Sequence, residues 1–186
     1  MINKTKQDRI NEFKTIFNHP MFEGLLPSDV VDKLIENGFF TAPASTKFHG
    51  NYEGGLYDHS REVMRELVNL SDTLGLKWKR PASPYIVGMF HDLCKIDEYT
   101  PIIDPTDGSK GFIRTKDLIL YGHGEKSVML LSELMQLTEE EVFCIRYHMG
   151  AYKTDDWDGY GKAIEKYETV LWTHTSDMYA SRVIGI

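Results

Sequence analysis

The strongest constraint on how this chain can fold is a set of six side chains, spread along it, that are of types able to ligate a metal ion. They are four histidines and two aspartates: His59, His91, Asp92, His123, His148 and Asp177. Most of these positions fall within, or at the start of, stretches whose apolar residues recur at helical spacing. Because a bundle of helices can project such side chains inward onto one pocket, we expect a helical fold in which the six positions share a centre.

The spacing of apolar residues predicts an all-α bundle of about seven helices. Thr138 and Glu141 match a capping box, and Ser28 is a candidate cap for a helix that Gly38 ends. The expected helices cover residues 6–17, about 29–37, 56–74, 84–95, 123–135, 139–148 and 165–182.

One small hairpin is the exception to this helical pattern. The β-prone segments YTPII and GFIRT flank the turn signal DPTDGSK, which predicts a hairpin near residues 98–116. The glycine-bearing stretches 39–55 and 149–161 are expected to be loops. We expect residues 1–40 to form a helical extension packed on the core. Residues 41–186 then form the domain with the six ligand-type positions, and the two parts make one compact unit.

Composition and charge narrow the class of protein. With 186 residues the chain fits one domain, and its longest apolar runs are much shorter than the roughly 20 residues that cross a bilayer. Cys94 and Cys144 are interpreted as reduced core thiols, which together with the lack of a signal peptide predicts a cytoplasmic protein without a membrane partner. A net charge of −7 argues against a duplex nucleic-acid surface. It remains compatible with a small anionic substrate, because bound cations can dominate the local field.

The ligand types suggest how two cations would be shared. A carboxylate has two oxygens and can bridge two ions, whereas an imidazole gives one nitrogen to one ion. Asp92 is therefore the expected bridge between two metals. The first is assigned to His59, His91 and Asp177, and the second to His123 and His148. Carboxylates in the outer shell are expected to orient the imidazoles.

Five segments carry a resemblance to the HD-domain superfamily of metal-dependent phosphohydrolases, and they occur in that family's order. They are GGLYDHS at 54–60, FHDLCK at 90–95, GHGEKS at 122–127, YHMG at 147–150 and THTSDMYAS at 173–181. The GGL-x-x-H opening with HDL-x-K is most similar to the bacterial branch that includes 3′→5′ exoribonuclease HD domains. The resemblance implies that His59, His91, Asp92 and Asp177 are the core ligands. It also implies that His123 and His148 correspond to the extra ligands of family members that bind a second metal.

The sequence departs from the family pattern at three points. The usual HD-x-GK is HDLCK here, so that Cys94 replaces a small glycine. The stretch DGYG at 158–161 is similar to the GYP loop of cyclic dinucleotide phosphodiesterases but lacks its proline and paired histidine, so that substrate is not assigned. No module of the OB-fold kind is recognised beside the domain, which favours a mononucleotide or short oligonucleotide over long RNA.

Three further residues are candidates for binding the substrate. Lys95 follows the HD pair and could neutralise a phosphate, or it could be a solvated lysine at a helix end. Lys126 lies one turn beyond His123 and is a second candidate. His49 precedes the GGL segment, where the resemblance implies a histidine near the pocket.

Other polar and aromatic residues have structural interpretations. His174 lies three residues before Asp177 and is assigned a packing or hydrogen-bonding role. Tyr152, Trp157 and Tyr160 could form a lid that stacks a base, or could pin a loop; the second interpretation is favoured.

The resulting functional expectation is hydrolysis of a phosphoester in a nucleotide, cyclic nucleotide or short oligonucleotide by a metal-activated hydroxide. Asp92 and Lys95 are the expected catalytic residues, and the cofactors are two divalent cations from among Mn, Co, Ni, Fe and Mg. A di-iron oxygenase is the alternative, because a set of imidazoles and carboxylates also suits iron. A non-catalytic ligand-binding module remains as a third hypothesis.

Overall fold

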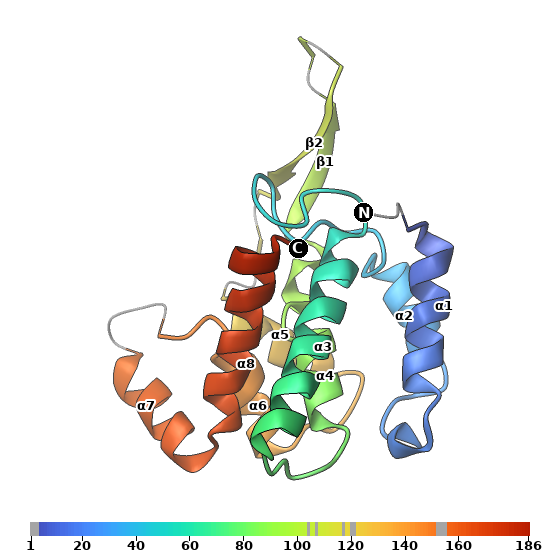
Figure 1. Ribbon diagram of the computed structural model, residues 1–186. Coiled ribbons are helices and arrows are strands. Elements are labelled where there is room, and N and C mark those ends of the chain that lie inside the picture. Colours follow the sequence, from blue (N-terminus) through green and yellow to red (C-terminus); the bar gives the residue numbers. More distant parts are fainter. Residues whose placement is uncertain (1–3, 104, 107, 117, 120–121, 152–155) are drawn as a thin grey trace.

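The protein is mostly helical, and a single small sheet extends from the helices (Figure 1). The structure, a computed structural model, describes residues 4–103, 105–106, 108–116, 118–119, 122–151 and 156–186. Over these residues it contains eight α-helices and two antiparallel strands, so the predicted helical fold with one hairpin is confirmed. The helices are α1 Lys6–Phe17, α2 Val30–Glu36, α3 Gly55–Leu74, α4 Ser83–Phe90, α5 His123–Ser132, α6 Glu139–Arg146, α7 Trp157–Lys166 and α8 Thr169–Met178.

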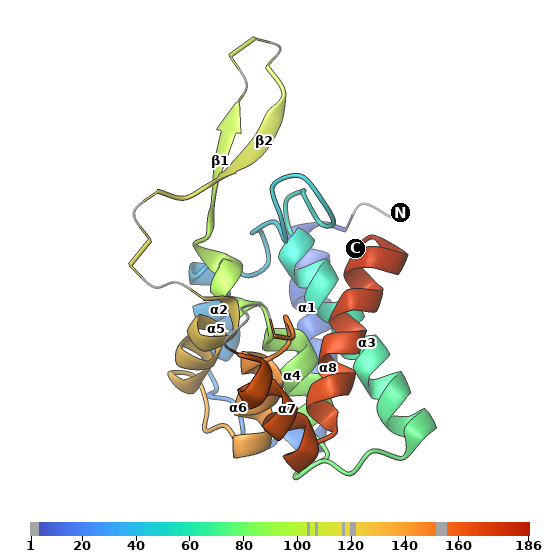
Figure 2. The same cartoon turned by 90° about the vertical axis from the view of Figure 1, so that its left-hand side faces the viewer.

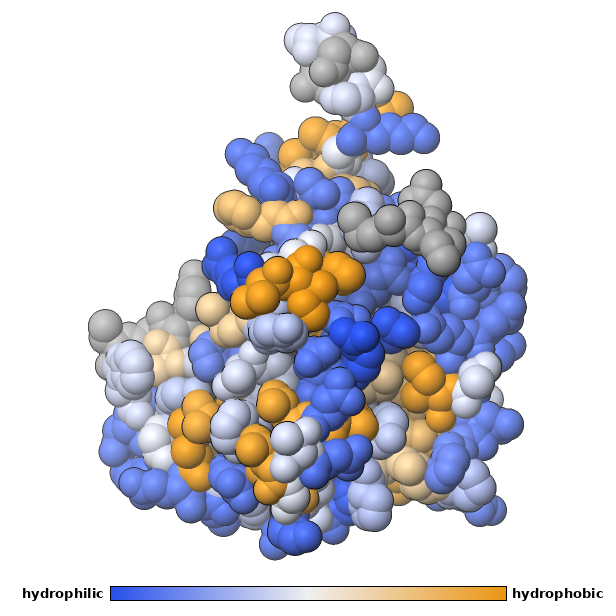
Figure 3. Space-filling model, viewed as in Figure 1, coloured by the Kyte–Doolittle hydropathy of each residue, from blue (hydrophilic) through white to orange (hydrophobic). Residues whose placement is uncertain are grey.

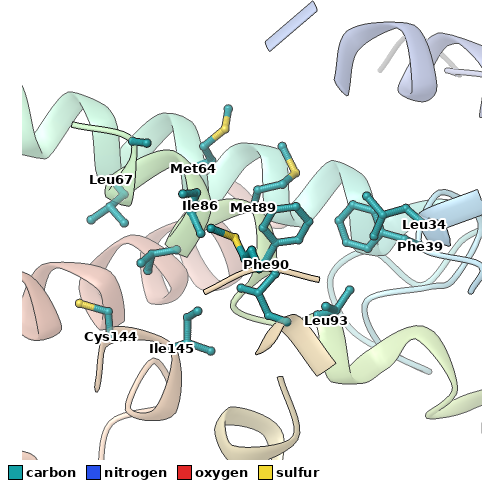
Figure 4. Close-up of a cluster of buried hydrophobic side chains, with 14 of the residues drawn as sticks. Leu34, Phe39, Met64, Leu67, Ile86, Met89, Phe90, Leu93, Cys144 and Ile145 are labelled. Atoms are coloured by element: carbon teal, nitrogen blue, oxygen red, sulfur yellow. The ribbon is translucent and has the colours of Figure 1, made fainter. Parts of the chain in front are cut away.

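Helices α3 and α4 form the centre of the bundle. Helix α4 is buried along almost its whole length, and α3 buries one face against it. A Cβ atom on Gly88 would collide with the backbone of Met64, so only glycine lets the two helices approach this closely. Figure 4 shows Met64, Ile86, Met89 and Phe90 gathered in the core at this crossing. The close packing brings His59 on α3 and His91 at the end of α4 together.

The first two helices pack on the same core. Phe13 of α1 and Leu34 of α2 are fully buried, and the Phe13 ring lies 6.1 Å from that of Phe90. Arg9 donates two hydrogen bonds, of 3.1 and 2.7 Å, to the carboxylate of Asp58 on α3. The first two helices thus share one core with α3 and α4, and the division into an N-terminal extension and a domain at residue 40 remains a prediction.

The hairpin consists of β1 Tyr99–Ile103 and β2 Lys110–Arg114, where the sequence predicts it. Its register pairs Tyr99 with Arg114 and Ile103 with Lys110. Two views of the ribbon and the space-filling view show it extending beyond the helices (Figures 1, 2 and 3). Its strands therefore contribute few residues to the core.

Three predicted helices end earlier than expected: α5 stops at Ser132 and not near Met135, and the early ends of α4 and α6 bear on the site. Helix α4 stops at Phe90 and not near Lys95, and a separate 3₁₀ turn follows over Leu93–Ile96. Asp92, at φ −105° and ψ 21°, joins the two elements. Helix α6 likewise stops at Arg146, two residues before His148. The backbone thus turns at His91, Asp92 and His148. Their side chains therefore need not follow the spacing of about 100° between residues in a regular helix.

The remaining corrections concern helix ends outside the site. The N-cap of α2 is Asp29 and not Ser28, and it makes no side-chain capping bond. The Thr138 capping box is confirmed, with Glu141 as its partner.

The expected loop over residues 149–161 is wrong at its end, because α7 already begins at Trp157. The expected last helix over 165–182 is two helices and a short π-helical segment, Tyr179–Ile184. The break falls at Tyr167, whose backbone is extended. Within the described ranges, no helix combines the length and the apolar character needed to cross a bilayer.

Candidate metal centre

The six ligand-type side chains come together at the meeting point of five helices. His59 lies on α3, and His91 and Asp92 follow α4. His123 is the first residue of α5, His148 follows α6, and Asp177 is in the last turn of α8. Five of the six are less than a tenth exposed, and the side chain of His123 is 31% exposed. The convergence expected from the sequence is present, whereas metal ligation by these residues remains a prediction.

The first half of the centre contains His59, His91 and Asp177. The Nε2 atoms of the two histidines lie 3.3 Å apart. Asp177 Oδ1 is 3.2 Å from His59 Nε2 and 4.0 Å from His91 Nε2. These three atoms are close enough for one cation to contact all of them.

Asp92 lies between this group and a second one. Its Oδ2 atom is 3.6 Å from His59 Nε2 and 3.5 Å from His91 Nε2. Its Oδ1 atom is 3.3 Å from His148 Nε2 and 3.7 Å from His123 Nδ1. Each oxygen of this carboxylate therefore faces a different pair of histidines, which is the arrangement a bridging ligand requires.

Backbone carbonyls orient three of the imidazoles. His59 Nδ1 lies 2.8 Å from the carbonyl oxygen of Ile186, and His91 Nδ1 lies 2.8 Å from that of Gly88. His148 Nδ1 lies 2.7 Å from the carbonyl oxygen of Ile145. In the tautomer that donates these Nδ1–H bonds, each Nε2 presents a lone pair to the centre. The carboxylates expected in this orienting role are thus replaced by carbonyls for these three residues.

Several polar atoms of the centre are buried without a hydrogen-bond partner. Within the described part of the chain they include Asp92 Oδ1, His123 Nδ1 and His148 Nε2. An unsatisfied buried polar atom costs about 1–3 kcal/mol, so three at one point call for an explanation. His148 Nε2 and His123 Nδ1 both lie near Asp92 Oδ1, and all three are atoms of kinds that bind metals, so a bound cation would satisfy them together. The residues present therefore fit a divalent metal.

The positive charge of Lys95 lies beside the buried Asp92 carboxylate. Its Nζ atom lies 2.6 Å from Asp92 Oδ2. Although burial opposes the effect, Lys95 and the neighbouring histidines hold the pKa of Asp92 well below its usual range. The pKa of Asp177 is also lowered. Burial alone would raise it, but the neighbouring His59 and His91 imidazoles lower it by more. The neighbouring Asp92 carboxylate and the Cys94 side chain raise the pKa of His123 to about 10. Both acids are therefore anionic near neutral pH.

The residues predicted to contact the substrate occupy different surroundings. The His49 ring lies 4.8 Å from the His59 ring, and burial lowers the pKa of His49 to about 4, so it is neutral near pH 7. Lys126 is buried and forms an ion pair with Asp97. His49 thus lies against the centre, whereas the Lys126 ammonium already has an anionic partner. Substrate contact by either residue remains a prediction.

Cys94 also lies at the centre, and the sequence interpretation did not assign it there. Its Sγ atom, a ligand atom of Asp92 and one of His123 all lie within 4.8 Å of one another. Both cysteines are buried and unbridged, as expected of reduced thiols. The signal in the sequence is a cysteine two residues after Asp92, where the resemblance implies a glycine.

The aromatic residues and His174 have mainly structural surroundings. His174 Nδ1 lies 2.7 Å from the carbonyl oxygen of His148 and so supports the turn that carries this ligand. Tyr160 is buried, with its ring 5.8 Å from that of Tyr147, while Trp157 is 63% exposed. Tyr152 lies outside the described residues.

A cavity of about 300 Å³ opens beside the second half of the centre. His123 lines it, together with Arg114, Arg146 and Tyr147. Arg146 pairs with Glu125 and Asp156 at 3.2 and 3.4 Å, and its guanidinium lies 4.2 Å from the centroid of the Tyr147 ring. The cavity is therefore lined by two arginines, each paired with a carboxylate, next to a ligand-type histidine.

Comparisons of the chain with protein-family models, with curated proteins and with solved structures found no match. The geometry of the buried histidine and aspartate cluster, and the sequence resemblance, are therefore what support a functional inference.

Proposed function

We propose that this protein is a metal-dependent phosphohydrolase of the HD type. Its substrate is a phosphoester of a nucleotide, a cyclic nucleotide or a short oligonucleotide. The observation that carries the proposal is the position of Asp92, whose two oxygens face two different pairs of histidines at 3.3–3.7 Å. A site for two cations that share a carboxylate is typical of enzymes that act on phosphate esters.

The cations supply the central chemistry. When bound, a pair of divalent ions provides a water activated at neutral pH and offsets the negative charge of the phosphoryl group. The residues of the chain hold and orient this pair. His59, His91 and Asp177 serve the first position, His123 and His148 serve the second, and Asp92 serves both.

Lys95 has a positioning role in this proposal. In the structure its ammonium is held by Asp92 Oδ2, at the edge of the first group. When cations take over the neutralisation of Asp92, the lysine charge becomes available to a phosphate oxygen at the same place. Burial keeps this interaction stronger than it would be in water.

The size of the cavity supports a small substrate. A volume of about 300 Å³ beside His123 is at the lower end of the range of small-molecule sites. Arg114 and Arg146 line it, and guanidinium groups suit the recognition of phosphate oxygens. The negative net charge of the chain argues against a long nucleic acid partner.

The experiment that tests the proposal combines metal analysis with a substrate panel. The panel contains nucleotides, cyclic nucleotides and bis(p-nitrophenyl) phosphate, each assayed with manganese, cobalt, nickel, iron and magnesium. The Asp92→Ala variant is expected to lose both bound metal and turnover. Asp158→Asn is the matched control, because the Asp158 side chain is 79% exposed on α7.

Two outcomes would contradict the proposal. One is hydrolysis by Asp92→Ala at the wild-type rate. The other is consumption of dioxygen by the iron-loaded protein with no release of phosphate from any substrate, which would support the di-iron oxygenase alternative.

A further inference from the structure

One buried cysteine lies beside the second half of the centre, and the proposed hydrolysis assigns it no role. Cys94 is in the 3₁₀ turn that follows Asp92, and it is only 2% exposed. Its Sγ atom lies within 4.8 Å of ligand atoms on both Asp92 and His123. Small shifts of these side chains would place all three around one ion.

The local backbone holds Cys94 against α5. The backbone N–H of Cys94 donates a 3.1 Å hydrogen bond to Ser127 Oγ. Ser127 lies four residues after His123 on the same helix, so the two share a face of α5. The turn is thereby fixed against the face that presents His123.

Independent of the cysteine, the neighbouring carboxylate points to a missing ligand. Asp92 Oδ1 has no hydrogen-bond partner within the described residues, although Asp92 is only 2% exposed. The same holds for His148 Nε2, which lies 3.3 Å from it and belongs to a fully buried residue. The space that these atoms face is therefore suited to a cation.

We propose that Cys94 is a thiolate ligand of the metal ion in the second half of the centre, together with Asp92 and His123. The inference deepens the proposed function and rests on it only for the presence of an ion at this position. When the ion binds, it replaces the thiol proton, which is released to solvent.

A thiolate changes which metals the second half prefers. Sulfur ligands favour zinc, and oxygen ligands favour magnesium, calcium and manganese. The first half offers only nitrogen and oxygen atoms, from His59, His91, Asp177 and Asp92. The two halves therefore differ in selectivity, and zinc or cobalt is preferred next to Cys94.

Cobalt reports on the thiolate directly. The full chain is stripped with a chelator and titrated anaerobically with Co²⁺, and the near-ultraviolet charge-transfer band of a cobalt thiolate is measured. The test variant is Cys94→Ala, and the matched control is Cys144→Ala. Cys144 is equally buried, but its Sγ lies 3.5 Å from Thr169 Oγ1, and it is in none of the ligand groups found among the described residues. Circular dichroism checks that each variant is folded.

X-ray absorption of the zinc-loaded protein gives a second measurement. The sequence contains two cysteines, so Cys94 is the only thiol that remains in Cys144→Ala. We expect this variant to show a sulfur neighbour at about 2.3 Å from zinc. The control thus tests the proposal even if Cys94→Ala fails to fold.

The expected result is a thiolate band in the wild type and in Cys144→Ala, and its loss in Cys94→Ala. Zinc affinity at the second position should also fall by about tenfold or more in Cys94→Ala, since even an outer-shell change costs about that much. If cobalt and zinc both bind but neither measurement detects sulfur, Cys94 is not a ligand. The proposed metal centre of histidines and aspartates would then remain, without the cysteine. If no metal binds to the wild type, both this inference and the proposed function are wrong.

Discussion

The Nζ atom of Lys95 lies 2.6 Å from Asp92 Oδ2, and both side chains are buried. This ion pair places Asp92, whose carboxylate faces the four ligand-type histidines, beside a buried positive charge. Removal of one partner from a buried pair leaves an uncompensated charge, so we expect this pair to stabilise the metal-free fold.

Lys95→Met should therefore destabilise the metal-free protein by about 3–5 kcal/mol. The loss should shrink when saturating Mn²⁺ is added, since bound cations take over the neutralisation of Asp92. Chemical denaturation with and without metal measures both effects. Lys162→Met is the control, because that lysine pairs with Asp158 on the exposed face of α7 and should have no measurable effect. Equal destabilisation by the two variants would show that the buried pair is unimportant.

The free energy of unfolding of the metal-free protein should fall as the pH is raised above neutral. The pKa of His123 is raised from 6.5 to about 10, so the folded state binds more protons than the unfolded state between these values. This contribution is complete below pH 6.5 and is lost as the pH rises through about 10. Unfolding free energies measured across this window should decline in the wild type. The decline should be smaller in His123→Gln, and identical slopes would contradict the assignment.

The same protein should be destabilised by acid as well. Asp177 and Asp92 have a lowered pKa in the folded state, so their contribution is present above about pH 4 and is lost as the pH falls. In the metal-free protein, Asp177→Asn should make the free energy of unfolding fall less steeply as the pH decreases. An unchanged slope would mean that Asp177 is not stabilised by the neighbouring imidazoles.

Gly88→Ala should disturb the centre from a distance. Its Cβ would collide with the backbone of Met64, so α3 and α4 must separate, and with them His59 and His91. Overpacking of this kind costs about 1–3 kcal/mol, and bound metal should fall as well. Gly161→Ala on α7 is the control, because its Cβ would meet open space and should stabilise the helix by roughly 0.5–1 kcal/mol. Full metal content in Gly88→Ala would show that the close crossing does not position the ligands.

His49→Ala tests the predicted substrate contact next to the centre. The His49 ring lies 4.8 Å from that of His59, but the ring is absent from the ligand groups of the described residues. We expect metal content to stay unchanged and kcat/KM to fall about tenfold, the equivalent of one lost hydrogen bond. His19→Ala, at an exposed position, should leave both quantities unaltered. A parallel loss of metal in His49→Ala would instead assign the ring to the metal centre.

The fold was predictable where local chemistry determines it. The Thr138 capping box, the apolar face of α3 and the pairing of β1 with β2 all depend on residues close in sequence, and the structure contains each of them. The early ends of α4 and α6 were not predictable in this way. There the apolar pattern continues past the helix end, and the turns make long-range contacts: the Cys94 N–H bonds to Ser127 Oγ on α5, and His174 Nδ1 lies 2.7 Å from the carbonyl oxygen of His148.

The site residues likewise fall into those that the sequence predicts and those that depend on the folded backbone. Ligand-type residues and their order are visible in the sequence, so the convergence of His59, His91, Asp92 and Asp177 could be expected. The approach of Cys94 to His123 could not, because it depends on the 3₁₀ turn after Asp92 and on its hydrogen bond to Ser127. The use of carbonyl oxygens to orient the imidazoles also depends on backbone geometry that periodicity does not reveal.

The central claim is that two ions share the Asp92 carboxylate. Its most direct test is an anomalous difference map from crystals of the manganese- or zinc-loaded protein, collected at the absorption edge of the metal. We predict two peaks about 3.5–4 Å apart, one near His59, His91 and Asp177 and the other near His123 and His148. A map without a peak beside Asp92, from crystals in which the metal is bound elsewhere, would contradict the account.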